Sequence, residues 1–142
     1  MPAGMVRQAP NVQKFPNILS GASLGAGALS ALSSKVPCYG AQAVYFTLSA
    51  DADPSAAAAP TIGHYFDQVA NQRRTSLGNH SAQDTDFPAA DISETAVFRV
   101  LPATGAGNMY GVFVSDQMDI RITNNGAGAI TNFRVDAHVI YN

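Results

Sequence analysis

One stretch of the chain has the residue pattern of a serine hydrolase. Residues 21–25 read Gly-Ala-Ser-Leu-Gly, and in hydrolases Gly-x-Ser-x-Gly places a nucleophilic serine on a tight turn between a strand and a helix. The rest of that arrangement is missing, because no strand is expected before Gly21 and no alternation of strands and helices follows. In a tract so rich in Gly, Ala and Ser the match arises easily by chance. We therefore expect no catalytic serine here and no enzyme activity.

The other residues that can bind metals or transfer protons are scattered along the chain. His64, His80 and His138 do not have a metal-binding spacing such as His-x-x-x-His. Asp84 and Asp86 offer carboxylate oxygens, but a calcium loop usually needs more ligands and a glycine at its sharp turn. A solvated acidic loop is the better interpretation, and the sequence predicts neither a metal ion nor another cofactor.

Cys38 is the only cysteine in the chain, which excludes an internal disulfide and a zinc site built from cysteines. A reactive thiol needs a nearby base or cation that favours the thiolate, and the neighbouring Val36, Pro37 and Tyr39 supply none. We expect Cys38 to be a small buried apolar group.

The composition indicates a surface that is poor in charge. The 142 residues are 46% apolar and 13% charged, whereas typical soluble domains carry about 25% charged residues. Such a surface suits permanent assembly, although a sequence rich in Ala and Gly could drift to the same composition. The net charge is −2 and the only basic run is the pair Arg73 and Arg74, which argues against a nucleic-acid partner. No segment reaches the roughly 20 apolar residues of a membrane helix, so no membrane association is expected.

Residues 95–142 read as four β-strands in close succession. In the last one, apolar residues such as Phe133 and Val135 alternate with polar residues such as Arg134 and Asp136. A period of two means that one face packs on a core while the other meets water or a partner. Residues 124–128, Asn-Asn-Gly-Ala-Gly, suit a hairpin loop between the last two strands. The strands expected from this pattern and from an earlier alternating segment cover residues 39–49, 95–101, 109–114, 118–123 and 133–141.

One segment has the period of a helix. Pro60 and the capping residue Thr61 precede apolar side chains spaced at i, i+3, i+4 and i+7, which predicts a helix over residues 61–71. Residues 72–94 form a long polar segment that could hold a short strand near residues 75–77 or 90–92. Together these elements predict a mainly β protein, an antiparallel β-sandwich with one short helix, and we favour a jelly roll as its specific form.

Residues 1–38 differ from the rest in composition. They are rich in Ala, Gly and Ser, and such a segment cannot bury enough apolar area to offset its own ordering entropy. We expect an extended N-terminal arm over residues 1–38 and a β-sandwich domain over residues 39–142; a leader without a role is the alternative. The apolar Ile140 on an otherwise polar face suggests the interface of a homodimer or trimer. The arm residues expected to enter partner grooves are Phe15, Ile18, Leu24, Leu29 and Leu32.

This layout resembles that of the cement (decoration) proteins of tailed-bacteriophage capsids. The resemblance rests on the arm of residues 1–38, the missing active site, the low charge, and the alternating strands at residues 118–123 and 133–141. It implies a structural protein made in the host cytoplasm that binds the major capsid protein on the outer surface of the virion and stabilises the capsid by bridging its subunits. No sequence motif defines such proteins, so the resemblance assigns no role to any residue.

Other assembly proteins would look similar. A phage head-completion or tail subunit shares the layout, as does an oligomeric β-sandwich of the fibre or carbohydrate-binding type. Sugar-binding modules usually present aromatic platforms, whereas this chain has no Trp and its five Tyr residues do not cluster in sequence. That difference disfavours the carbohydrate-binding alternative.

Overall fold

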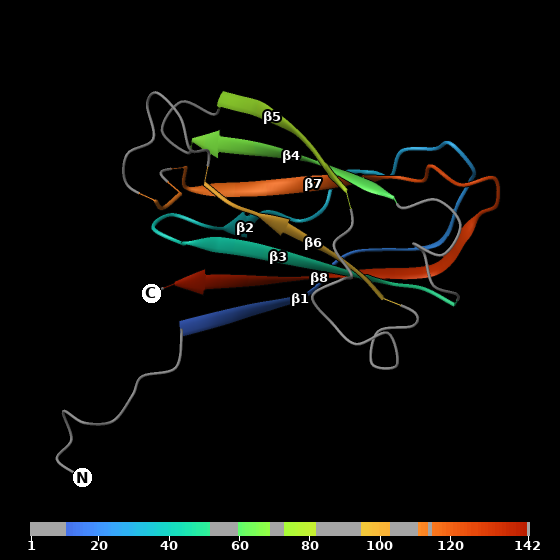
Figure 1. Cartoon of the computed structure of the whole chain (residues 1–142), viewed down its shortest axis with the longest axis horizontal. Helices are drawn as coiled ribbons and strands as arrows, with labels where there is room; N and C mark the ends of the chain where they lie inside the picture. The colour runs from blue at the N-terminus through green and yellow to red at the C-terminus, as the bar shows by residue number, and fades with distance from the viewer. Residues whose placement is uncertain are drawn as a thin grey trace, which may run out of the picture.

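The computed structural model describes residues 11–51, 60–68, 73–81, 95–102, 111–113 and 115–141. These residues form strands and connecting segments, and none of them is helical (Figure 1). The strands are β1 Asn11–Leu24, β2 Val36–Pro37, β3 Ala43–Ser49, β4 Thr61–Gln68, β5 Arg73–Ser81, β6 Thr95–Val100, β7 Gln117–Thr123 and β8 Ile130–Tyr141.

The strands make two four-stranded sheets, which we call sheet A and sheet B. Sheet A has the order β1-β8-β3-β6 and sheet B the order β2-β7-β4-β5, and all their pairings are antiparallel. The first strand therefore pairs with the last, the second with the seventh, the third with the sixth and the fourth with the fifth. This nested order is a long hairpin wrapped into two layers, the jelly-roll arrangement. It confirms the predicted antiparallel β-sandwich.

The core lies between the two sheets and follows the predicted alternation. On β8, Phe133, Val135, Ala137 and Val139 are buried while Arg134 is exposed. The inward residues of the other strands include Phe46, Phe98, Met118, Ile120 and Ile122, all with no exposed surface. Burial of large apolar side chains is the main favourable contribution to folding.

The helix predicted over residues 61–71 is wrong where the structure describes that segment. Thr61–Gln68 is strand β4, which lies between β7 and β5 in sheet B. Ile62 and His64 are both buried and pair with Ile122 and Ile120 of β7, so the segment follows a period of two. Its β-branched and aromatic residues fit a sheet, and pairing on both sides outweighs the helical spacing of its apolar residues. Residues 69–71 lie outside the described part.

Two other local predictions in the second half of the chain had mixed outcomes. The short strand suggested near residues 75–77 exists as part of β5, while residues 90–92 lie outside the described part. The strand expected over residues 109–114 is wrong where it is described, because Gly111 and Val112 form a bend and Phe113 belongs to no strand. Gly111 has a φ of 65°, a conformation that interrupts a strand.

The predicted loop at residues 124–128 exists between the last two strands, but it is not the hairpin loop that the sequence predicts. It joins β7 of sheet B to β8 of sheet A, so it crosses between the sheets and is not the turn of a hairpin. Neither asparagine of this loop has a positive φ; among described residues other than glycine, those are Asn17 and Asn132. The loop is held instead by the side chain of Asn124, which is described below.

The boundary expected at residue 38 does not separate an arm from the sandwich. Residues 11–24 are β1, the edge strand of sheet A, and residues 36–37 are β2 of sheet B. The backbone ladder with β8 supplies stabilisation that the small side chains of this segment lack. Gly21 helps the fit, because the Phe133 ring lies 2.9 Å from where a Cβ would be. Residues 1–10 lie outside the described part.

Candidate interaction surfaces

Residues 29–34, which we call the serine seam, run along the edge of β7 although they form no regular strand. The backbone N–H of Ser30 donates to the Ile122 carbonyl (2.8 Å), and that of Ser33 donates to the Ile120 carbonyl (2.9 Å). In return, the hydroxyl oxygens of Ser30 and Ser33 accept hydrogen bonds from the backbone N–H groups of Ile122 (2.9 Å) and Ile120 (3.0 Å). The two serines thus replace part of a strand ladder and satisfy buried N–H groups of β7.

The seam also joins the two sheets. Each serine hydroxyl donates to the carbonyl of the next residue, at 2.8 Å for Ser30 and 2.9 Å for Ser33. The backbone N–H of Ser34 donates to the carbonyl of Ile18 on β1 (2.8 Å). The seam is therefore bonded to β7 of sheet B and to β1 of sheet A, so its backbone is ordered by the chain itself.

Leu29 and Leu32 are exposed on this ordered backbone. Their exposed fractions are 58% and 38%, and they flank serines that are buried. Among the described residues, the other large apolar side chains with comparable exposure are Val12, Tyr39 and Leu101. The seam is thus a fixed surface with two leucines available for contact.

The other predicted arm residues serve this chain's own core. Ile18 and Leu24 are only 7% and 6% exposed, and Phe15 packs partly buried against the same core. Of the five residues expected to enter partner grooves, the structure leaves Leu29 and Leu32 at the surface. The composition of this segment gives no sign of its pairing with β8, and this is why the sequence predicts an arm separate from the sandwich.

Ile140 lies on the outer face of sheet A, as predicted. It is half-buried and stands opposite Val12 of β1 and Ala43 of β3. We call these three residues the apolar row. Val12 is 51% exposed whereas Ala43 is buried, so the exposed part of the row lies toward the edge strand β1.

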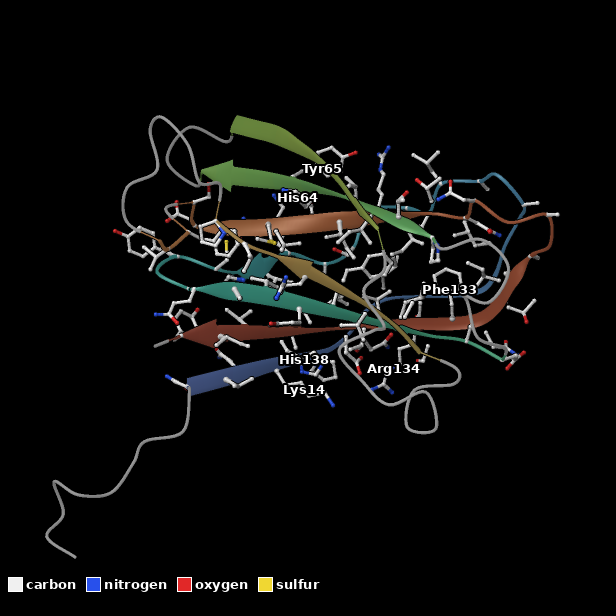
Figure 2. All side chains as sticks on the ribbon, viewed as in Figure 1. Lys14, His64, Tyr65, Phe133, Arg134 and His138 are labelled. Atoms are coloured by element: carbon white, nitrogen blue, oxygen red, sulfur yellow. The ribbon has the colours of Figure 1, made fainter. Side chains whose placement is uncertain are left out.

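Charged side chains lie next to the apolar row on the same face, and Figure 2 shows Lys14 and Arg134 among them. Both contact Asp136 of β8. The guanidinium of Arg134 donates two hydrogen bonds to the Asp136 carboxylate, at 2.9 and 3.0 Å. The Asn17 backbone N–H donates a third at 2.7 Å, and the Lys14 ammonium lies 4.0 Å away. The Arg134 hydrogen bonds lower the pKa of Asp136 below its ordinary value, with smaller contributions from Asn17 and Lys14, although partial burial opposes them. Asp136 therefore links β1 to β8 as a carboxylate.

His138 is the next outward residue on β8. It stands opposite Lys14 of β1 and Tyr45 of β3, and its Nε2 lies 3.5 Å from the Thr47 hydroxyl. Partial burial, followed by the charge of Lys14, lowers the pKa of His138, and Asp136 partly offsets this. The lowered pKa favours a neutral imidazole between the strands.

Among the residues that the structure describes, the remaining candidates for chemistry do not gather into a site. Cys38 is buried, its Sγ donates to the Ser115 carbonyl at 3.4 Å, and burial together with the charge of Asp116 raises its pKa to about 12. His64 is buried on sheet B, whereas His138 lies on the outer face of sheet A (Figure 2). Within the described residues, no group of three or more His, Cys, Asp or Glu side chains is placed to hold a metal ion.

The structure does not give the Gly-x-Ser-x-Gly stretch the local fold that a catalytic serine requires, and it places His80 in a strand. Residues 21–24 are the end of an edge strand, so Ser23 is not on a strand-to-helix turn. His80 belongs to β5, while Asp84 and Asp86 lie outside the described part. Across the ranges that the structure describes, no helix has the length and apolar character needed to span a membrane.

Sequence reasoning missed Asn124 as the residue that fixes the β7–β8 connection. Its side chain is bonded to four backbone groups and is only 2% exposed. The first position of a loop rich in Asn and Gly was the available signal, since Asn side chains often bond to nearby backbone. The contacts with the end of β1, about 100 residues earlier, had no signal in the sequence.

No protein-family model matches the sequence, and no curated protein matches it either. The fold is similar to that of the PRD1 vertex protein P5, with 12% identity, a TM-score of 0.44, and coverage of 92% of this chain and 96% of that chain. The crystal structure of FLHE matches with 10% identity and a TM-score of 0.35, covering 91% of this chain and 95% of that one. A structure of infectious bursal disease virus, Gt strain, matches with 8% identity and a TM-score of 0.29, covering 93% of this chain and 42% of that one. At these values the likeness assigns no role to any residue of this chain.

Proposed function

We propose that this chain is a non-catalytic structural protein of a bacteriophage virion, which binds the outer surface of the capsid and stabilises it by bridging neighbouring subunits. The observation that carries the proposal is the serine seam, which holds Leu29 and Leu32 exposed on an ordered backbone. A jelly-roll sandwich with a charge-poor sequence supports it, because this fold is common among viral capsid domains. Fold alone does not determine function, so the seam is the surface to test.

The ordered seam changes the mechanism expected from the sequence. A mobile arm would lose about 1–2 kcal/mol of backbone entropy per residue on binding. The seam is already bonded to β7 and β1, so its leucines can contact a capsid without that cost. Binding to assembled particles and not to free subunits would then stabilise the shell by mass action.

Truncation of the N-terminal segment is a poor test of the proposal. Deleting residues 1–34 would remove β1 from sheet A together with Ser30 and Ser33 of the seam. The better variant is Leu29→Ser with Leu32→Ser, which alters two exposed side chains and leaves the seam hydrogen bonds in place. The partner is the capsid protein encoded in the same genome, assembled into particles.

We expect the double leucine variant to bind particles at least about tenfold more weakly, because burying a leucine contributes about 1.5–3 kcal/mol and 1.4 kcal/mol is a factor of ten. Co-sedimentation of the chain with particles measures binding, and the temperature of genome release measures stabilisation. Leu101→Ser is the matched control, since Leu101 is 49% exposed after β6 and outside the seam. Equal binding by the double variant and the wild type would rule out the seam as the contact. Lack of binding by the folded wild type would rule out the capsid role.

A further inference from the structure

We propose that residues 11–15, the first part of β1, exchange between two copies of this chain, so that each copy's segment pairs with β8 of the other. We call these residues the exchange segment. The proposal concerns the purified protein alone and does not depend on a capsid partner. It rests on a break within β1 and on the small number of side-chain contacts that hold the segment. It also rests on the fit between this segment and β8, which their pairing within one chain shows.

The first observation is the break in the ladder between β1 and β8. Phe15 pairs with Ala137 and Leu19 pairs with Val135, so residues 16–18 of β1 stand opposite a single residue of β8. The exchange segment is therefore joined to the rest of β1 through a three-residue connection that the ladder does not hold.

The second observation is the conformation of that connection, which we call the hinge. Pro16 lacks a backbone N–H and favours an extended conformation at the residue before it. Asn17 has a φ of 52°, in the left-handed region, which asparagine adopts more readily than most residues but at a greater cost than glycine. Short strained connections favour strand exchange, because extending them in a dimer relieves the strain.

The third observation is how little of the exchange segment is packed. Residues 11–14 are exposed, and Phe15 alone packs partly buried against the core. In the second part of β1, by contrast, Ile18 and Leu24 are buried. Most of the attachment is the backbone ladder to residues 137–141 of β8, and that ladder forms equally well with the same segment of another copy.

Two hydrogen bonds hold the hinge and oppose the exchange. The Ser34 N–H donates to the Ile18 carbonyl at 2.8 Å, and the Asn17 N–H donates to the Asp136 carboxylate at 2.7 Å. When the hinge extends, these hydrogen bonds are lost while the strain at Asn17 is relieved. The pairs Val12–Ile140 and Lys14–His138 are remade between copies, so the second copy is the partner that fits.

The experiment places single cysteines on different chains. Val12→Cys and Ile140→Cys replace a cross-strand pair on the outer face, and one variant is labelled with ¹⁵N so that mass spectrometry identifies the chain of origin. The two variants are mixed at high micromolar concentration, incubated and oxidised. The native Cys38 is buried, with a pKa of about 12, so it remains a thiol. Circular dichroism checks that each variant is folded, and Lys14→Cys with His138→Cys provides a second pair at the next register position.

We expect disulfides between Val12→Cys of one chain and Ile140→Cys of the other, in several-fold excess over links between two Val12→Cys chains. The matched control is Tyr45→Cys mixed with Arg99→Cys, a cross-strand pair of β3 and β6 that exchange leaves within one chain and that should give no such links. Asn17→Gly relieves the strain at the hinge and should lower the yield of exchanged dimer several-fold. Predominant links between two Val12→Cys chains would overturn the proposal in favour of edge-to-edge pairing of β1. A chain carrying both cysteines that forms its disulfide only internally, with no links in the mixture, would overturn it in favour of a fixed β1.

Discussion

The side chain of Asn124 fastens the connection between the two sheets. Its Nδ2 group lies within hydrogen-bonding distance of the carbonyls of Leu24 (3.0 Å), Gly25 (3.1 Å) and Gly128 (2.9 Å). Because this group has two hydrogens, one of them is shared between two carbonyls. Its Oδ1 accepts from the backbone N–H of Gly126 (2.9 Å). Both functional groups of the amide are thus engaged, and they tie the start of the β7–β8 loop to the end of β1.

Asn124→Asp tests this arrangement with almost no change in side-chain volume. The new carboxylate can still accept from Gly126, but it cannot donate and it faces carbonyl oxygens at a buried position. We expect a loss of about 3 kcal/mol or more in the free energy of unfolding, as for other uncompensated buried charges. Urea denaturation at pH 7 measures the loss. Asn125→Asp, at the exposed neighbouring position, is the control, and equal stability of the two variants would contradict the role of Asn124.

Individual residues were predictable from the sequence where a repeating pattern covered them. The inward residues of β7 and β8 follow from alternation, so Met118 and Val135 were placed correctly. Asn124 was not, because two of its four partners, Leu24 and Gly25, lie at the end of β1 and just after it, about 100 residues earlier. For the same reason nothing in the sequence distinguished Ile18, which is buried, from Leu29, which is exposed.

At the scale of elements, the serine seam substitutes side-chain hydrogen bonds for strand pairing. Because the hydroxyls of Ser30 and Ser33 accept from the N–H groups of Ile122 and Ile120, removing a hydroxyl leaves a buried donor unsatisfied. We expect Ser30→Ala and Ser33→Ala each to lower the free energy of unfolding by about 1–3 kcal/mol.

Amide hydrogen exchange gives this prediction a local readout. The exchange rate should rise at Ile122 in Ser30→Ala and at Ile120 in Ser33→Ala, before the remaining amides of sheet B are affected. Ser34→Ala is the control, because the contacts described for Ser34 involve its backbone. Unchanged exchange at both isoleucines would show that the hydroxyls do not protect these amides.

Elements were predictable when their own period was unambiguous. β3, β6, β7 and β8 follow from alternation, whereas β4 has apolar residues at both helical and strand spacings. Pairing with β7 and β5 decides its structure, and that is information from distant segments. β1 had no periodic signal, since Gly and small residues weaken it and its stability comes from the ladder with β8.

Across the molecule, the nested strand order determines how far apart in the sequence the paired strands lie. β1 pairs with β8, so the two ends of the described chain meet in one sheet. A two-layer antiparallel architecture could be inferred from the sequence. The number of strands could not, because β1 and β2 were assigned to an arm and β4 to a helix. Strand order could not, because pairing partners far apart in sequence leave no local pattern. Contacts of this kind are also typical of slowly folding β proteins.

A single substitution in the core between the two sheets can test which face of β8 points inward. Val135 has no exposed surface, so Val135→Asp places an unpaired carboxylate between the sheets and should cost about 3 kcal/mol or more. Arg134→Ala, at the neighbouring exposed position, removes a surface ion pair with Asp136 and should cost far less, because exposed ion pairs contribute little to stability. Urea denaturation compares the two. A Val135→Asp variant as stable as the wild type, beside an unfolded Arg134→Ala, would invert the assigned faces.

The pairing of the first strand with the last also determines how the molecule carries a mechanical load. Asn11, where β1 begins, stands opposite Tyr141, where β8 ends, at one corner of sheet A. The two antiparallel strands extend side by side from this corner (Figure 1). A force that separates these two residues acts perpendicular to the strands, so the hydrogen bonds between β1 and β8 break one after another. A pull along β1 against the rest of the sheet loads many of those bonds together. The resistance of this sandwich to force therefore depends on the point of attachment, and the corner at Asn11 and Tyr141 is where it yields first.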